Sequence, residues 1–209
     1  MTRRRVEISP GFWLFLGIVL LWMPLSQAVC LFGAAGLHEL GHLLASIRAG
    51  GGFRGIRLGF FGWEMALDRE RLSYRRQILV DLAGPLMNAL VCGASLLFIR
   101  ARPTPSRLFF FFCNALYGAA QLLPIPQLDG GRALTAALSL FLPRETAERI
   151  AGAVGWTVGA AALAAGILLF RRTGNPSPAL FLPGAALTGQ QKKLRRHMPS
   201  QPFFQEQIT

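Results

Sequence analysis

The sequence QAVCLFGAAGLHELGHLLASI, residues 27–47, is a long apolar run that carries His38, Glu39 and His42 near its middle. As a helix, this run extends about 30 Å, which matches the hydrocarbon core of a membrane. The pattern therefore predicts a transmembrane helix. Ionisable side chains are costly at that depth unless they face the protein interior, so the three polar residues predict an intramembrane functional site.

The spacing of the two histidines predicts a metal site. Residues four apart project from the same face of a helix, so His38 and His42 can bind one ion. Zinc in hydrolytic sites takes three protein ligands and leaves the fourth position to water, while a nearby carboxylate serves as general base. Glu39 is the candidate base. The alternative on these residues alone is that they only pack helices together.

The composition extends the membrane prediction to the whole chain. Hydrophobic residues make up 52% of the sequence and charged residues 15%, and the mean hydropathy is positive, which is unusual for a soluble domain. We therefore expect an all-α polytopic membrane protein with about six transmembrane helices. Five crossings are the alternative, because the fifth apolar segment is short enough to be re-entrant. The segments are residues 11–25, 27–47, 78–99, 108–126, 133–142 and 150–170.

The chain is basic, with 22 Lys+Arg against 10 Asp+Glu. These basic residues lie between apolar segments, as the positive-inside rule requires, so we expect no nucleic-acid partner. Six crossings with a cytoplasmic N-terminus keep the loop 48–76 and the C-terminal tail inside, whereas five would export the tail. The N-terminal run could instead be a secretory signal. We expect one membrane domain, residues 1–172, and a basic, flexible cytoplasmic tail, residues 173–209.

A third metal ligand has to lie at membrane depth as well. Among the carboxylates, only Asp81 and Asp129 fall within or beside the later apolar segments. Asp129 lies in LLPIPQLDGGR, residues 122–132, where two prolines and two glycines interrupt a long apolar run. Such a break is tolerated only inside a helix bundle, so Asp129 is the preferred third ligand of one zinc ion. Asp81 is interpreted as a helix-start carboxylate paired with a nearby arginine.

These elements resemble the site-2 protease family of intramembrane zinc metalloproteases. The resemblance covers roughly residues 10–140 and rests on His38-Glu39-x-x-His42, on Leu128-Asp129-Gly130, and between them on Ala83-Gly84-Pro85-Leu86-Met87-Asn88. It implies that Asp129 binds zinc and that Glu39 activates water. It also implies that Gly84, Pro85 and Asn88 lie near the site and bind substrate.

The finer resemblance is to the bacterial branch of sporulation-stage proteases that release membrane-bound pro-sigma factors. Gln121 stands where the family often has Asn, and Gln127 where it often has Pro, which puts the local loop geometry in doubt. About forty residues follow Phe170, so we expect no nucleotide-binding module of the kind that some members carry. The implied partners are a membrane-protein substrate, the lipid bilayer and an inhibitory or regulatory membrane protein. The implied location is the bacterial cell membrane.

Residues 53–67 predict a small membrane-associated β-hairpin, because apolar residues alternate with Arg57 and Gly59 and then with Glu64 and Ala66. An intramembrane protease has to accept an unwound substrate, so we hypothesise that this hairpin pairs with the substrate backbone. An interfacial loop is the alternative. Two other functions are weighed for the chain as a whole: a divalent metal transporter, and an inactive family relative that acts as a membrane binding partner.

Overall fold

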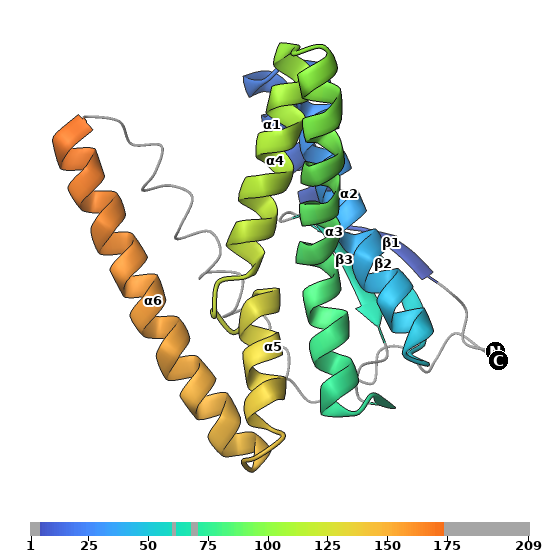
Figure 1. Ribbon diagram of the computed structural model, residues 1–209, viewed down its shortest axis with the longest axis vertical. Coiled ribbons are helices and arrows are strands. Elements are labelled where there is room, and N and C mark those ends of the chain that lie inside the picture. Colours follow the sequence, from blue (N-terminus) through green and yellow to red (C-terminus); the bar gives the residue numbers. More distant parts are fainter. Residues whose placement is uncertain (1–4, 60–61, 68–70, 174–209) are drawn as a thin grey trace. The chain divides into compact units, whose positions relative to one another are not determined.

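The computed structural model describes residues 5–59, 62–67 and 71–173, and most of these residues are helical (Figure 1). Each of the six predicted apolar segments overlaps with a helix, so the predicted fold class is confirmed. Three helices are long and apolar enough to cross a membrane, namely α2, α3 and residues 144–168 of α6. The helices are α1 (Pro10–Trp22), α2 (Leu25–Arg48), α3 (Tyr74–Ala101), α4 (Pro105–Gln121), α5 (Asp129–Leu138) and α6 (Arg144–Thr173).

The chain divides into two compact units, residues 1–155 and 156–209. The first unit holds α1 to α5, the strands and the beginning of α6, and every feature discussed below belongs to it. The predicted tail, residues 173–209, lies outside the described residues except for Thr173. The predicted domain boundary at residue 172 stays a prediction.

Prolines mark where several helices start. Pro10 and Pro105 occupy the first turns of α1 and α4, where the missing N–H has no helical partner to lose. Pro24 precedes α2 and separates it from α1. After α2, Gly50 adopts a φ of +80°, a left-handed conformation that ends helices.

Helix α3 is central, and it contacts α2, α4 and α5. The contact with α2 is close because Gly41 faces the backbone of α3. A Cβ atom at Gly41 would lie 2.5 Å from the carbonyl oxygen of Ala83. Small residues allow helices in membranes to approach in this way. The contact brings the histidine motif of α2 against the Gly-Pro segment of α3.

Helices α4 and α5 follow one another along α3 (Figure 1). Together they run the length of α3 once, as a single passage with a break between the two helices. With 17 and 10 residues, they extend about 26 Å and 15 Å, while the 28 residues of α3 extend about 42 Å. Pro124 and Pro126 prevent α4 from continuing as a regular helix. The break lies at mid-depth, and α5 starts there with Asp129.

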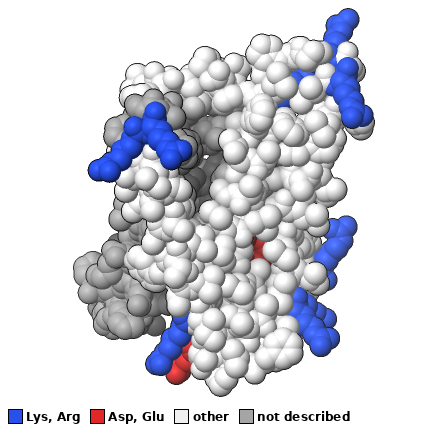
Figure 2. Space-filling view, turned by 60° about the vertical axis from the view of Figure 1, so that its left-hand side comes forward, with Lys and Arg blue, Asp and Glu red and all other residues white. Residues whose placement is uncertain are grey.

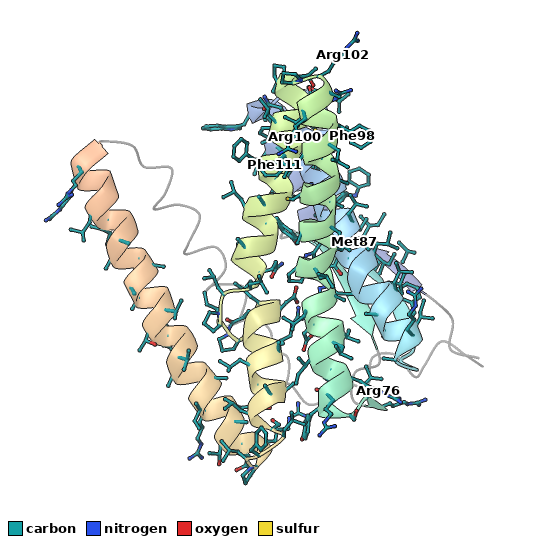
Figure 3. The ribbon with its side chains drawn as sticks, in the orientation of Figure 1. Arg76, Met87, Phe98, Arg100, Arg102 and Phe111 are labelled. Atoms are coloured by element: carbon teal, nitrogen blue, oxygen red, sulfur yellow. The ribbon has the colours of Figure 1, made fainter. Side chains whose placement is uncertain are left out.

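The two ends of this passage lie at opposite ends of α3. Arg107 of α4 donates to the carbonyl of Phe98, near the last turn of α3. Leu140, just after α5, lines a pocket together with Tyr74, at the first turn of α3. Figure 3 labels Arg76 at one end of α3 and Arg100 and Arg102 at the other. Because α4 and α5 share one passage, the arrangement favours five crossings, the alternative to six.

The predicted hairpin is present as β2 (Phe53–Gly59) and β3 (Gly62–Leu67), which pair antiparallel with Ile56 opposite Met65. A third strand, β1 (Arg5–Ile8), pairs parallel with β2 and was not predicted. The strand order is β1-β2-β3, and β3 contacts α2. Within the described residues, the outer edge of β3 therefore carries no further strand. The hairpin turn, residues 60–61, lies outside the described residues.

Several polar side chains are buried, whereas many large apolar side chains are exposed, which is unusual for a soluble domain. The largest fully buried side chains include His38, Asn88, Asn114 and Asp129. By contrast, Trp22 and Phe141 are each 86% exposed. In Figure 2 most of the described residues on the visible face are uncharged. Such a surface fits a hydrocarbon environment, so this is a membrane protein.

Candidate metal centre

Three buried side chains from α2 and α5 meet at one point. Nε2 of His38 lies 2.8 Å from Oδ2 of Asp129, and Nε2 of His42 lies 2.9 Å from the same oxygen. The two Nε2 atoms are 3.1 Å apart. Ligand atoms of a tetrahedral zinc ion with bonds near 2.0 to 2.1 Å lie about 3.3 Å from one another. The triangle therefore has nearly the size that such an ion needs, and this group could hold a metal.

The side chain of Asn88 fixes the tautomer of His38. The Asn88 amide nitrogen donates to the carbonyl of Ala34 and to Oδ1 of Asn114, whose own amide nitrogen donates to the carbonyl of Phe110. These bonds orient the Asn88 amide so that its Oδ1 faces Nδ1 of His38 at 2.6 Å. An amide oxygen only accepts, so Nδ1 carries the proton and Nε2 of neutral His38 keeps its lone pair.

His42 is fixed in the same way by a backbone group. Its Nδ1 lies 2.7 Å from the carbonyl oxygen of Val80 in α3 and must donate to it. Pro85 lacks the N–H that would bond to the carbonyl of Asp81, so the helix is loosened in the turn next to Val80. The Nε2 atom of neutral His42 is then also unprotonated and points at the same site.

This donor set suits a cation. With both histidines neutral, two imidazole lone pairs and a carboxylate oxygen converge at 2.8–3.1 Å in a buried place, and a positive charge between them relieves their mutual repulsion. Nitrogen and carboxylate donors with ordered hydrogen-bond partners suit a divalent ion such as zinc. The residues present therefore fit the metal that the sequence predicts.

Gly84 lets α3 pass directly against the histidines. A Cβ atom at this position would lie 2.7 Å from Nε2 of His38 and would also overlap Nε2 of His42. Any side chain here would occupy the space where the ligand atoms meet. The Gly-Pro element thus acts at the ligands themselves: Gly84 leaves room for the rings, and Pro85 loosens the helix beside the carbonyl that orients His42.

The break between α4 and α5 positions Asp129. Gly131 packs so tightly on the carbonyl of Ile125 that a Cβ atom would overlap it, and Gly130 does the same with the carbonyl of Leu122. These glycines let the first turn of α5 fold back onto the broken segment. Asp129, in that first turn, is fully buried and faces α2.

Glu39 lies beside the three candidate ligands. It follows His38 in α2, is half-buried, and interacts electrostatically with His42, His38 and Asp129. It does not belong to the ligand triangle. A carboxylate next to a metal site, without being a ligand itself, is in the place that a general base needs.

Two residues of α4 at the site were not predicted to act there. The ring of Tyr117 packs edge-to-face on His38, with ring centroids 4.9 Å apart. Gln121 donates to the Tyr117 hydroxyl at 3.3 Å, and the Gln121 side-chain oxygen has no hydrogen-bond partner among the described residues. One feature of the sequence hinted at their involvement, namely that Gln121 stands where the site-2 protease family often has Asn.

The predicted site residues lie on α2, α3 and α5, and the structure brings these helices together. His38, His42 and Asp129 meet, Glu39 adjoins them, and Gly84 and Asn88 contact the histidines. The predicted role of Gly84, Pro85 and Asn88 in binding substrate stays a prediction.

Comparison with known proteins identifies the fold. No family model matches the chain. Among solved structures, the site-2 protease from Methanocaldococcus jannaschii superposes with a TM-score of 0.67 and covers 89% of each chain at 22% identity. The chain has the site-2 protease fold. The three motifs named above occur on this fold in the expected order.

The chain is also similar to a curated protein. Stage IV sporulation protein FB of Bacillus subtilis (strain 168) is 26% identical over 149 residues, which are 70% of this chain and 52% of that protein. The chain thus spans about half the length of the curated relative. The finer resemblance to a sporulation-stage branch agrees with this match.

Proposed function

We propose that this chain is an intramembrane zinc endopeptidase. The observation that carries the proposal is the convergence of Nε2 of His38, Nε2 of His42 and Oδ2 of Asp129 at 2.8–3.1 Å beside the middle of the apolar helix α2, with Glu39 next to them. His38, His42 and Asp129 would hold the ion. The relation to site-2 proteases supports the same activity.

The roles of the residues follow from their positions. A bound zinc ion supplies Lewis acidity to water and to the scissile carbonyl. The Glu39 carboxylate accepts the proton of the attacking water and returns it to the leaving amine. Asn88 and the carbonyl of Val80 keep both histidines in the tautomer that can bind the metal. The apolar surface around the bundle keeps the site within the bilayer.

The substrate is a transmembrane or membrane-associated segment of another protein. A peptide bond within a helix is shielded by its own hydrogen bonds, so the segment has to unwind before cleavage. The outer edge of β3 is suited to pair with the unwound backbone by strand addition, since β2 already has partners on both sides. We therefore assign the predicted substrate-pairing role of the hairpin to β3.

The biological setting is regulated proteolysis in the cell membrane of a bacterium. The similarity to a sporulation protein supports a substrate such as a membrane-bound pro-sigma factor or an anti-sigma factor. We expect a multi-pass protein with a cytoplasmic N-terminus and an inhibitory or regulatory membrane protein as a further partner.

The geometry favours catalysis over metal transport. A transport site has to release its ion along a path of polar positions. Here both histidines are fixed by further hydrogen bonds, and His38, His42 and Asp129 are 1%, 4% and 0% exposed. Such a site fits a resident ion. An inactive relative is disfavoured because the base and all three candidate ligands are present.

The decisive experiment compares the parent chain with Glu39→Gln after co-expression with single-span candidate substrates. We expect cleavage within the membrane segment by the parent and at least a hundredfold loss in the variant, with an unchanged zinc content. The zinc content distinguishes a lost base from a lost metal. Equal cleavage by both proteins would contradict the mechanism.

A further inference from the structure

Two buried carboxylates and one arginine form a group next to the metal ligands. Arg132, one turn after Asp129 in α5, donates from its guanidinium to Oδ1 of Asp129. The Nε atom of the same guanidinium lies 3.9 Å from Oδ1 of Asp81 in α3. Asp81 is 2% exposed and Asp129 is fully buried. The arginine therefore links a candidate ligand on α5 to a second acid on α3.

The two oxygens of Asp129 have different partners. Oδ2 faces Nε2 of both histidines, whereas Oδ1 accepts from Arg132. A carboxylate whose second oxygen is already occupied by a charged donor offers only one oxygen to a metal. The arrangement thus keeps the protein ligands at three and leaves the fourth position of a tetrahedral ion to water.

The charges near the metal site explain why Arg132 has an acidic partner, Asp81. A divalent ion together with the carboxylates of Asp129 and Glu39 is neutral. The cation of Arg132 beside it would repel the metal in a medium of low dielectric constant. Asp81 restores neutrality at an ion-pair distance from the guanidinium. Burial of a carboxylate is costly without a nearby positive charge, and the guanidinium supplies one.

We propose that Arg132 and Asp81 form a positioning pair that holds Asp129 as a ligand through one oxygen and sets the metal affinity of the site. The proposal rests on the proposed metal centre. Neither residue touches the metal, so both act through Asp129. The sequence predicts that Asp81 pairs with an arginine close to it in the chain, whereas Arg132 comes from α5.

The first test measures zinc affinity of the purified full chain by competition with a fluorescent chelator. For Arg132→Gln and for the isosteric Asp81→Asn we expect affinity to fall about 10- to 100-fold, as for other groups that support metal ligands. The matched control is the exposed ion pair of Arg144 and Glu148, 2.9 Å apart on α6. Arg144→Gln and Glu148→Gln should retain the parent affinity.

The double variant Arg132→Gln/Asp81→Asn tests whether the two residues act together. Removing the arginine also removes the need for Asp81, so we expect the double variant to lose no more affinity than Arg132→Gln alone. Losses that multiply would show independent effects and overturn the pairing. Parent affinity in both single variants would overturn the proposal as well.

A spectroscopic test examines the one-oxygen ligation after substitution with Co²⁺. The parent should show the strong visible absorption of a four-coordinate ion. In Arg132→Gln the freed Oδ1 can also bind, so the absorption should weaken toward that of a five-coordinate ion. An unchanged spectrum would contradict the proposal. If the parent itself binds neither metal, the proposed function fails; normal parent binding with unchanged variants would refute only the positioning pair.

Discussion

At Gly84 the contact with the metal ligands leaves no space for a methyl group. We predict that Gly84→Ala lowers zinc affinity at least tenfold and abolishes cleavage, because the added Cβ atom would lie 2.7 Å from Nε2 of His38. The measurement is zinc content together with substrate cleavage. Gly93→Ala is the control on the same helix, where a Cβ atom meets nothing within 4 Å.

The control should retain full activity and gain slightly in stability, since alanine favours a helix over glycine by roughly 1 kcal/mol. Equal behaviour of Gly84→Ala and Gly93→Ala would mean that α3 does not lie against the histidines as described.

Asn88 illustrates what could be predicted for a single residue. The motif Gly84-Pro85-x-x-Asn88 placed it near the site through resemblance. Its hydrogen bonds run through Ala34 of α2 and Asn114 of α4, which are 54 and 26 residues away in the chain. The spacing of residues within one segment cannot predict hydrogen bonds to residues so far away in the chain. The role in fixing the tautomer of His38 therefore came only from the structure.

Among the helices, the sequence predicts that the chain is broken between α4 and α5. Two prolines and two glycines within residues 124–131 disfavour a continuous helix. The prediction that this break lies inside the bundle is confirmed. The sequence did not predict that α5 continues along α3 after the break. A ten-residue helix is also short enough to enter the membrane and return to the same side.

The outer edge of β3 can be tested as the place where substrate pairs. In a hairpin closed by Gly59 and Gly62, the N–H of Met65 points away from β2. We predict that Met65→Pro lowers cleavage at least tenfold with zinc content unchanged, because proline cannot donate to an added substrate strand. Met65→Ala keeps the N–H and is the matched control, with activity close to that of the parent.

Should Met65→Pro cleave like Met65→Ala, substrate addition at β3 would be wrong. Loss of zinc in Met65→Pro would instead indicate a disturbance of α2, which β3 contacts.

For the whole molecule, the shared passage of α4 and α5 predicts where the connecting segments lie. In a chain whose three native cysteines are replaced by alanine, single cysteines at Ser73 and Pro143 should react with an impermeant thiol reagent from the same face of the membrane. A cysteine at Pro103 should react from the opposite face. The measurement is labelling in oriented vesicles.

This pattern distinguishes the two crossing numbers. Six separate crossings place Pro143 on the same face as Pro103, so reaction of these two positions from one side would contradict the shared passage. The prediction concerns α3, α4 and α5 and the start of α6, all within residues 1–155.

The sequence alone predicts a membrane protein with helices in the apolar segments and a hairpin, and it predicts His38, His42 and Asp129 as metal ligands with Glu39 as base. These predictions are possible because apolar length, residue spacing and helix-breaking residues act within one segment. The folded chain adds how Asn88 and Val80 orient the histidines, why Gly84 is glycine, which strand joins the hairpin, and how Arg132 links Asp129 to Asp81. Each of these depends on contacts between residues far apart in the chain, and the packing of α2, α4 and α5 on α3 creates them.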